Sequence, residues 1–364
     1  MTTGMRDRST MIRPLLVLLF ALAAPASLAA DTKDSDTAVP LFEDNAVLDV
    51  TITAPFDHIM HTRSLEEEMP GTLVYADPVT GEEVSLDIEV RARGKFRRQK
   101  EICSFAPLRL DLRLDFKKSN ETLFANSDKL KLVTHCRNGW ELYEQSVHKE
   151  YLAYRILNLL TDFSFRVRFM NVRYIEASSG EEVISGPAFI IESEDQLARR
   201  LDMERDASEK TTIEALDPEH TNLVSVFQYL IGNTDFSPIM GPPGDECCHN
   251  YVLLTGKNRQ ISVPYDFDVT GFADPPHAHP NPRFDLRSVK QRLYRGRCAN
   301  NEHLEKSFIV FQARKPAIYE LVESQPGLSN RERKRVKRYI DKFYKLIDSD
   351  RQVKRRLLDA CLGD

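Results

Sequence analysis

Residues 141–160 read ELYEQSVHKEYLAYRILNLL, and two later segments read VRFMNVRYIE (167–176) and VISGPAFII (183–191). In the first segment, apolar residues recur from Val147 to Leu157 at spacings of four, three and three, which is the period of an amphipathic helix. The other two segments are rich in β-branched and aromatic residues, which indicates strands. The middle of the chain is therefore predicted to be one long helix followed by a pair of strands.

The chain before this helix is predicted to be rich in strands. Residues 83–91 follow the turn Asp77-Pro-Val-Thr-Gly81 and form a β-hairpin with the strand before it. Residues 108–114 alternate Leu with Arg or Asp at a period of two, as a half-buried strand does. The expected strands are 46–54, 72–76, 83–91, 108–114 and 130–134. Residues 45–192 are thus predicted to be a β-rich N-terminal lobe that contains one long helix.

The chain after residue 192 is predicted to be mainly helical. Asp217-Pro218 is a helix start signal before the apolar segment 222–231. Further helices are expected over 197–202 and from His303 to the end, and strands over 251–254 and 260–264 form a hairpin. Residues 193–364 are thus a helical C-terminal lobe. A β-rich lobe joined to a helical lobe predicts a two-lobed α+β fold with a ligand cleft at the junction.

The last part of this lobe is strongly basic. Residues 331–357 are rich in Arg and Lys, but apolar residues between Val336 and Ile347 form a stripe at helical spacing. This pattern predicts an amphipathic helix with a solvated basic face. A patch that binds anions or a membrane surface is the alternative.

Composition restricts the class of protein. The chain has 364 residues, of which 41% are hydrophobic and 29% charged, with a formal net charge of −5. These values exclude a disordered, collagen-like or low-complexity chain. A net negative charge argues against a partner that is a nucleic acid.

The N-terminus is predicted to be a signal peptide. Arg6, Arg8 and Arg13 precede the apolar run 14–24, and small residues continue to Ala30. Residues 1–30 are therefore expected to be removed on export, which leaves no transmembrane span and a periplasmic or secreted protein. Residues 31–44 are polar and acidic and are predicted to form a tether.

Export makes disulfides the expected state of the cysteines. The six are Cys103, Cys136, Cys247, Cys248, Cys298 and Cys361. Adjacent cysteines rarely bond to each other because one peptide bond restricts the disulfide geometry. The preferred pairing is Cys103 with Cys136, with the Cys247-Cys248 doublet linked to Cys298 and Cys361. Free buried thiols are the alternative.

Between residues 231 and 271 lies the densest group of chemically active residues. Asp235 follows a predicted helix, and Asn250, Asp266 and Asp268 flank the predicted hairpin. Two or three carboxylates and an amide on neighbouring loops suit a Mg²⁺ ion bound with phosphates. In phosphoryl transfer, one Asp can orient the attacking hydroxyl while an Asn and another Asp hold the metal. Each residue alone is as readily explained as a turn or helix cap.

His277-Ala-His279 is a second candidate. These histidines could bind a transition metal, but four prolines between residues 275 and 282 surround them. A proline-stiffened surface loop is therefore the expected structure.

The motifs of this region resemble those of the spore-coat CotH kinase family, which contains secreted, atypical protein kinases. The resemblance rests on Gly232-Asn-Thr-Asp235, His249-Asn-Tyr251 and Pro264-Tyr-Asp-Phe-Asp268, with weaker support from Glu89-Val-Arg-Ala-Arg-Gly94 and Pro187-Ala-Phe-Ile-Ile-Glu192. It covers roughly residues 85–275. It implies a kinase-like fold and the transfer of the ATP γ-phosphoryl group to an exported or surface protein, with Mg²⁺, or alternatively Mn²⁺, as the metal.

The resemblance also implies roles for individual residues. Asp235 matches the catalytic aspartate and Asp266 the metal-binding one. Asn250 is expected to hold the metal with Asp266, and Asp268 is the alternative ligand if the metal binds the second aspartate of the pair. The phosphate-gripping base stays open among Arg109, Lys129 and Lys131. Glu150 is the candidate that positions this base through an ion pair, and Glu192 lies where the strand enters the link between the lobes.

The sequence also departs from the family pattern. Fifteen positions separate Asp235 from Asn250, and no G-x-G-x-x-G is present, with Arg93-Gly94-Lys95 as the nearest substitute. The alternative function is therefore a catalytically inactive binding or assembly protein of the envelope. A metal-dependent phosphoesterase that uses the same aspartates is a third hypothesis.

Overall fold

The computed structural model describes residues 1–4, 39–113 and 116–363. Most of the predicted signal peptide and tether, residues 5–38, lies outside these residues. Residues Thr37–Asp364 form one compact unit. Within the predicted tether, Leu41 and Phe42 of the 3-10 helix Pro40–Phe42 are buried in the core.

Seven strands form a closed barrel in the order β1-β2-β3-β4-β5-β7-β6. They are β1 Leu48–Ala54, β2 Met69–Ala76, β3 Glu83–Ala92, β4 Leu108–Asp111, β5 Lys129–Val133, β6 Val167–Glu176 and β7 Glu182–Ile191. All seven correspond to strands that the sequence pattern predicts. Two short helices, α1 Phe56–Thr62 and α2 Phe116–Ser119, lie between them in sequence.

The closure of this barrel shows that the predicted two-lobed, kinase-like fold is wrong. After the long helix, β6 pairs in parallel with β1 from Leu48↔Met170 to Ala54↔Glu176, and β7 pairs with β5. The two late strands thus join both edges of the early sheet, and a closed barrel does not fit a two-lobed kinase fold. Local periodicity shows that a segment is a strand but not which strand lies beside it.

The interior of the barrel is apolar. On β3, Leu86, Ile88 and Val90 point inward and are fully buried, whereas Asp87 between them is exposed. This alternation is the period-two pattern of the sequence. On β3 it leaves the polar side chains on the outside of the barrel.

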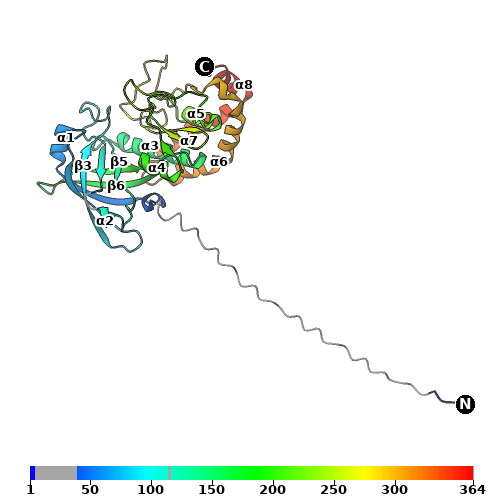
Figure 1. Ribbon diagram of the computed structural model, residues 1–364, viewed down its shortest axis with the longest axis horizontal. Coiled ribbons are helices and arrows are strands. Elements are labelled where there is room, and N and C mark those ends of the chain that lie inside the picture. Colours follow the sequence, from blue (N-terminus) through cyan, green and yellow to red (C-terminus); the bar gives the residue numbers. More distant parts are fainter. Residues whose placement is uncertain (5–38, 114–115, 364) are drawn as a thin grey trace. The chain divides into compact units, whose positions relative to one another are not determined.

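The helices form a second core that is continuous with one side of the barrel. Val147 and Tyr151 of the long helix α3 (Glu141–Leu160) pack in one cluster with Phe169 of β6 and with residues of the later helices. Figure 1 shows α3 between the barrel and these helices. They are α4 Glu194–Arg200, α5 Pro218–Ile231, α6 Leu304–Ser324, α7 Asn330–Ile347 and α8 Asp350–Val353, with a 3-10 turn at Cys298–His303 and a π turn at Lys354–Leu358. Helix α3 thus belongs as much to the helical part as to the β-rich part.

Three short strands make a second sheet in the order β10-β9-β8, with β8 Glu204–Arg205, β9 Tyr251–Thr255 and β10 Gln260–Pro264. The predicted hairpin is confirmed as β9 and β10. Tyr251 pairs with Pro264, so the residues just before β9 and just after β10 lie side by side. This register brings Asn250 close to Asp266.

The cysteines form three disulfides, only one of which was predicted. Cys103–Cys136 is confirmed. The predicted links from the doublet are wrong, because Cys298 bonds to Cys361 and Cys247 bonds to Cys248. The chain end returns to Cys298, whose backbone N–H donates to the carbonyl oxygen of Leu362 at 2.9 Å. That return makes Cys361 the partner within reach.

Among the described residues, no helix has both the length and the apolar character that crossing a membrane requires.

Candidate functional site

One cavity of about 510 Å³ collects the residues of the predicted catalytic and metal-binding set. We call it the main cavity. Asp235, Asn250, Asp266 and Asp268 all line it, and cationic side chains of a loop after β3 lie on it as well. The other lining residues are Arg93, Gly94, Lys95, Phe96, Arg97, Pro107, Asn233, Thr234, Val269, His277, His279, Pro280, Asn281, Pro282 and Arg283.

The end of α5 places Asp235. The helix stops at Gly232, whose φ of +67° is left-handed, and a Cβ there would clash with the Tyr339 hydroxyl. The chain then turns at Asn233, whose Oδ1 accepts the Asp235 N–H at 2.9 Å. Asp235 is therefore held on an ordered turn with its carboxylate exposed.

The β9–β10 hairpin places Asn250 and Asp266. Both residues have left-handed backbones, with φ of +58° and +63°. Asn and Asp adopt this conformation more easily than other non-glycine residues. The Tyr265 N–H donates to the Asn250 carbonyl at 3.0 Å, which joins the two strand ends.

Helix α3 supports this arrangement through two side chains one turn apart. The Tyr154 hydroxyl accepts the Asp266 N–H at 2.9 Å. Glu150 is buried and accepts a long hydrogen bond from Arg97 at 3.4 Å. Positions 150 and 154 share a helix face, and both side chains line a hollow of about 10 Å³ that also borders Asp266 and Arg97.

Arg97 connects Glu150 to the aspartates. Its Nε lies 2.9 Å from Asp268 Oδ2, in addition to its contact with Glu150. Burial disfavours the charge on Arg97, but Glu150 and Asp268 outweigh burial and raise its pKa. Glu150 therefore does form an ion pair, with Arg97 as the partner rather than Arg109, Lys129 or Lys131.

The loop that carries Arg93 and Arg97 is anchored at its base. The buried guanidinium of Arg63 donates to the carbonyl oxygens of Arg98, Cys103 and Ser104 at 2.7–2.9 Å. The Cys103–Cys136 disulfide ties the same base to the segment between β5 and α3. These contacts hold residues 93–105 over the aspartates.

Arg93 has no ion-pair or hydrogen-bond partner for its side chain among the described residues, although it is half-buried and lines the main cavity. Burial and the positive charge of Arg97 lower its pKa, against the opposing charge of Asp266. A guanidinium that is withdrawn from water and lacks a counter-ion is suited to bind an anion.

Asp235 forms a pair with His249. The Nε2 of His249 lies 2.9 Å from Asp235 Oδ1, and this hydrogen bond lowers the pKa of Asp235 and raises that of His249. The carboxylate is thus held ionised by His249.

Asp266 has the opposite environment. Burial, reinforced by the adjacent carboxylate of Asp268, raises the pKa of Asp266 well above its usual range. Two close carboxylates in a buried site need a proton or a cation between them. Asn250 is oriented to contribute as well, because its Nδ2 donates to the Asp235 carbonyl at 2.7 Å and this leaves its Oδ1 available as a ligand.

The remaining predicted cofactor residues lie outside the main cavity. Lys131 lines a hollow of about 10 Å³ beside Asp266, and its Nζ binds Glu194 Oε1 at 2.8 Å. Arg109 pairs with Lys131 across β4 and β5, with its Nε buried and without a partner. Glu192 is occupied by Arg200 at 2.9 Å and by the Arg166 N–H at 3.0 Å. Its contacts join β6 to α4.

The segment with His277 and His279 is a loop with exposed residues, as expected, and it also forms a wall of the main cavity. His277 is buried next to Phe96 and Tyr143, with ring centroids 5.8 and 5.7 Å away. Burial lowers its pKa to about 4, so the ring is neutral near pH 7. The prolines of this segment therefore stiffen a part of the site.

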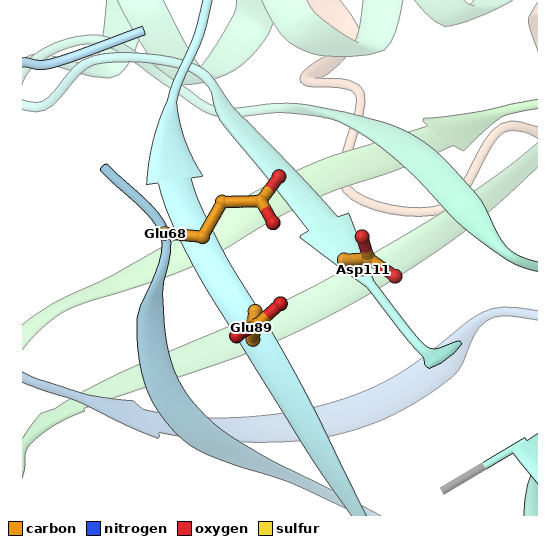
Figure 2. Close-up of side chains that lie close together, drawn as sticks. All are labelled: Glu68, Glu89 and Asp111. Carbon is orange, nitrogen blue, oxygen red and sulfur yellow. The ribbon is translucent and has the colours of Figure 1, made fainter. Parts of the chain in front are cut away.

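A second carboxylate cluster lies on the barrel. Figure 2 shows Glu68, Glu89 and Asp111 with their carboxylates close together, and their oxygens lie within 4.8 Å of one another. Such a group could hold a metal ion. Lys129, the third candidate base, instead bridges this cluster, with its Nζ 3.3 Å from Asp111 and 3.7 Å from Glu68. Arg91 and Arg113 neutralise it further, at 3.3 Å from Glu68 and 2.5 Å from Asp111.

Comparison with protein-family models gives no match for this chain, and comparison with curated proteins gives none either.

Arg97 is the site residue that the sequence reasoning did not single out, because nothing in the sequence connects it with Glu150, 53 positions away. Arg93 belongs to the Arg93-Gly94-Lys95 segment that was the nearest substitute for a glycine-rich loop, but no role of its own followed from the sequence. His249 belongs to the His249-Asn-Tyr251 motif. Its proximity to Asp235 becomes visible only once β9 is folded against the end of α5.

Proposed function

We propose that this chain is a metal-dependent phosphotransferase that moves the γ-phosphoryl group of ATP to a hydroxyl group of an exported or surface protein. One observation carries the proposal: carboxylates and an amide oxygen line the same cavity as Arg93, which is half-buried and has no side-chain partner among the described residues. A magnesium–triphosphate complex needs both kinds of group, oxygen ligands for the metal and cations for the phosphates. The motif resemblance to CotH kinases supports the same reaction, and the disulfides support a place outside the cytoplasm.

The donor residues fit a divalent cation. Asp266, Asp268 and the Oδ1 of Asn250 would hold Mg²⁺, or alternatively Mn²⁺. Burial and the charge of Asp268 raise the pKa of Asp266 although Arg97 and Arg93 oppose them, so a further cation would stabilise the ionised carboxylate. When bound, the ion would neutralise charge on the phosphate oxygens. Arg93 would grip a phosphate from the other side, and Arg97 would hold Asp268 in position.

Asp235 is the residue that would act on the acceptor. The acceptor oxygen bonds to the γ-phosphorus as the bond from that phosphorus to the β–γ bridging oxygen breaks, and ADP leaves with the electron pair. The hydroxyl proton passes to Asp235. Its exposed carboxylate, held ionised by His249, is suited to orient this hydroxyl at the open side of the cavity.

One observation favours the alternative of a catalytically inactive binding or assembly protein. Asp268 already has a cationic partner in Arg97 at 2.9 Å, which weakens its charge as a metal ligand. In that alternative, the Glu150–Arg97–Asp268 chain is a structural ion-pair network.

Nucleotide titration with and without Mg²⁺ distinguishes the phosphotransferase from the inactive binding protein. Binding of ATP at 100 times its dissociation constant should stabilise the chain by about 2.7 kcal/mol, only with Mg²⁺ present. Labelled ATP should then transfer its γ-phosphoryl group to the chain itself or to a protein acceptor. Binding without transfer to any acceptor would favour the inactive protein. Absence of nucleotide binding would refute the phosphotransferase, and release of phosphate from simple esters would instead indicate a phosphoesterase.

A further inference from the structure

A pocket with a surplus of positive charge lies between α7, α3 and the connection that precedes α6. Its volume is about 270 Å³. Five cationic side chains line it, namely Lys149, Lys290, Arg335, Arg338 and Lys342, against the two acids Asp274 and Glu332. This surplus stands out in a chain whose formal net charge is −5. We call it the basic pocket.

The two acids of the basic pocket are already paired. Glu332 binds Lys149 Nζ at 3.3 Å and Arg335 Nη1 at 2.6 Å, and Asp274 binds Lys290 Nζ at 2.6 Å. In the part of the chain that the structure describes, Arg338 and Lys342 form no ion pair. Both lie on the face of α7 that borders the pocket, four positions apart, so they can contact one ligand together.

Lys149 supplies a buried cation at the base of the pocket. Only 4% of its side chain is exposed, and it shares its acid partner Glu332 with Arg335. Burial lowers the pKa of Lys149 against the opposing effect of Glu332. A buried ammonium group that shares one carboxylate with a guanidinium is incompletely neutralised, so an anion in the pocket would find a buried cation as well as two exposed ones.

We propose that the basic pocket is a binding site for a small oxyanion of the phosphate type. Its volume limits the ligand: it is below the roughly 300–1,000 Å³ of pockets for drug-sized molecules and many times the roughly 30 Å³ that one water occupies. The pocket volume therefore suits a phosphate ion with a few waters better than a whole nucleotide. The site is separate from the main cavity and does not depend on the proposed phosphotransferase activity. The basic pocket and the main cavity are close along the chain, because Lys149 precedes Glu150 and Asp274 follows the turn that carries Asp266 and Asp268.

The test is calorimetric titration of the full chain with inorganic phosphate at constant ionic strength. The pocket variant is Arg338→Ser with Lys342→Ser. The control is Arg331→Ser with Lys334→Ser, which removes the same two charges from exposed positions of α7 that do not line the pocket. Melting temperatures without phosphate check that both variants fold.

Saturable phosphate binding is expected for the unmodified chain and the control, and binding at least about tenfold weaker for the pocket variant, since two charged donors are lost. Equal affinity in all three proteins would mean that the basic face of α7 attracts phosphate without a site. That result would overturn the proposal, as would the absence of saturable binding to the unmodified chain.

Discussion

Asp235 and Asp266 line the same cavity but have opposite surroundings. Asp235 is exposed and held ionised by His249, whereas Asp266 is half-buried beside Asp268. A base that receives a proton from a substrate must be accessible, and a metal ligand must be shielded and close to other oxygens. The proposed division of roles follows from this difference.

Asp235→Asn should lower turnover by roughly 10²–10⁴-fold while ATP affinity stays nearly unchanged, because a positioned base is lost and no metal ligand is. Asp266→Asn should weaken Mg²⁺–ATP binding as well as turnover, because it removes a full charge from the metal ligands. If Asp268 is the stronger ligand, Asp268→Asn will show the larger loss of affinity. Asp87→Asn, on the outer face of β3, is the control. Stability losses with unchanged nucleotide affinity in all three site variants would mean that these aspartates only cap turns.

Arg93 is the residue for which the structure offers the clearest ligand-binding role. Arg93→Met should weaken ATP binding by about tenfold or more, since a charge-assisted contact to phosphate is lost, and should leave folding stability nearly unchanged because the side chain has no described partner to lose. Lys100→Met, an exposed position of the same loop, is the control. Affinity for ATP can be measured by the same calorimetric titration. Equal affinity in the two variants would assign phosphate binding to another residue.

At the scale of elements, the loop between β3 and β4 depends on one buried side chain. Arg63 donates to the carbonyl oxygens of Arg98, Cys103 and Ser104, and a further contact reaches Met60 at 3.0 Å. These acceptors lose their donor when the guanidinium is removed, and a buried acceptor without a partner costs about 1–3 kcal/mol.

Arg63→Met should therefore lower the free energy of unfolding by about 3 kcal/mol or more and make residues 94–104 sensitive to proteases. It should also weaken ATP binding, although Arg63 does not line the main cavity. Urea unfolding and limited proteolysis are the measurements, with Arg173→Met on the outside of β6 as the control. Intact protease resistance in the Arg63 variant would show that the Cys103–Cys136 disulfide alone holds the loop.

At the scale of the whole molecule, buried histidines should make stability depend on pH. Burial lowers the pKa values of His135, His148 and His220 to about 4 in the folded chain, against about 6.5 when exposed. Between these values the unfolded chain binds protons that the folded chain does not. The folded chain is therefore most stable, as far as these histidines are concerned, above about pH 6.5, and this stability is lost as the pH falls toward 4.

Each of these histidines should lower the free energy of unfolding at pH 5 by about 2 kcal/mol relative to its value at pH 7. His148→Gln should reduce the difference in unfolding free energy between pH 7 and pH 5 by about that amount. His61→Gln, at an exposed position, should leave the difference unchanged. Urea unfolding at both pH values is the measurement, and an unchanged pH dependence in the His148 variant would refute the assignment.

The sequence by itself determined the local elements. Its periodicity predicted the helix over 141–160 and the strands over 167–176 and 260–264 with the bounds that the structure has. It also selected Asp235, Asn250, Asp266 and Asp268, because carboxylates and an amide on loops beside a predicted helix and hairpin suit a metal ion. Helix and strand periods are properties of a few consecutive residues, so they can be read without knowing what lies opposite.

Only the tertiary structure decided which of these elements meet. The pairing of β1 with β6 joins residues more than 120 positions apart and turns an expected open lobe into a barrel. The same kind of contact brings Arg97 to Glu150 and His249 to Asp235, and it leaves Cys298 to pair with Cys361. Such contacts depend on the packing of the whole unit around two cores, and no local pattern of residues records which distant segment will complete a sheet edge or an ion pair.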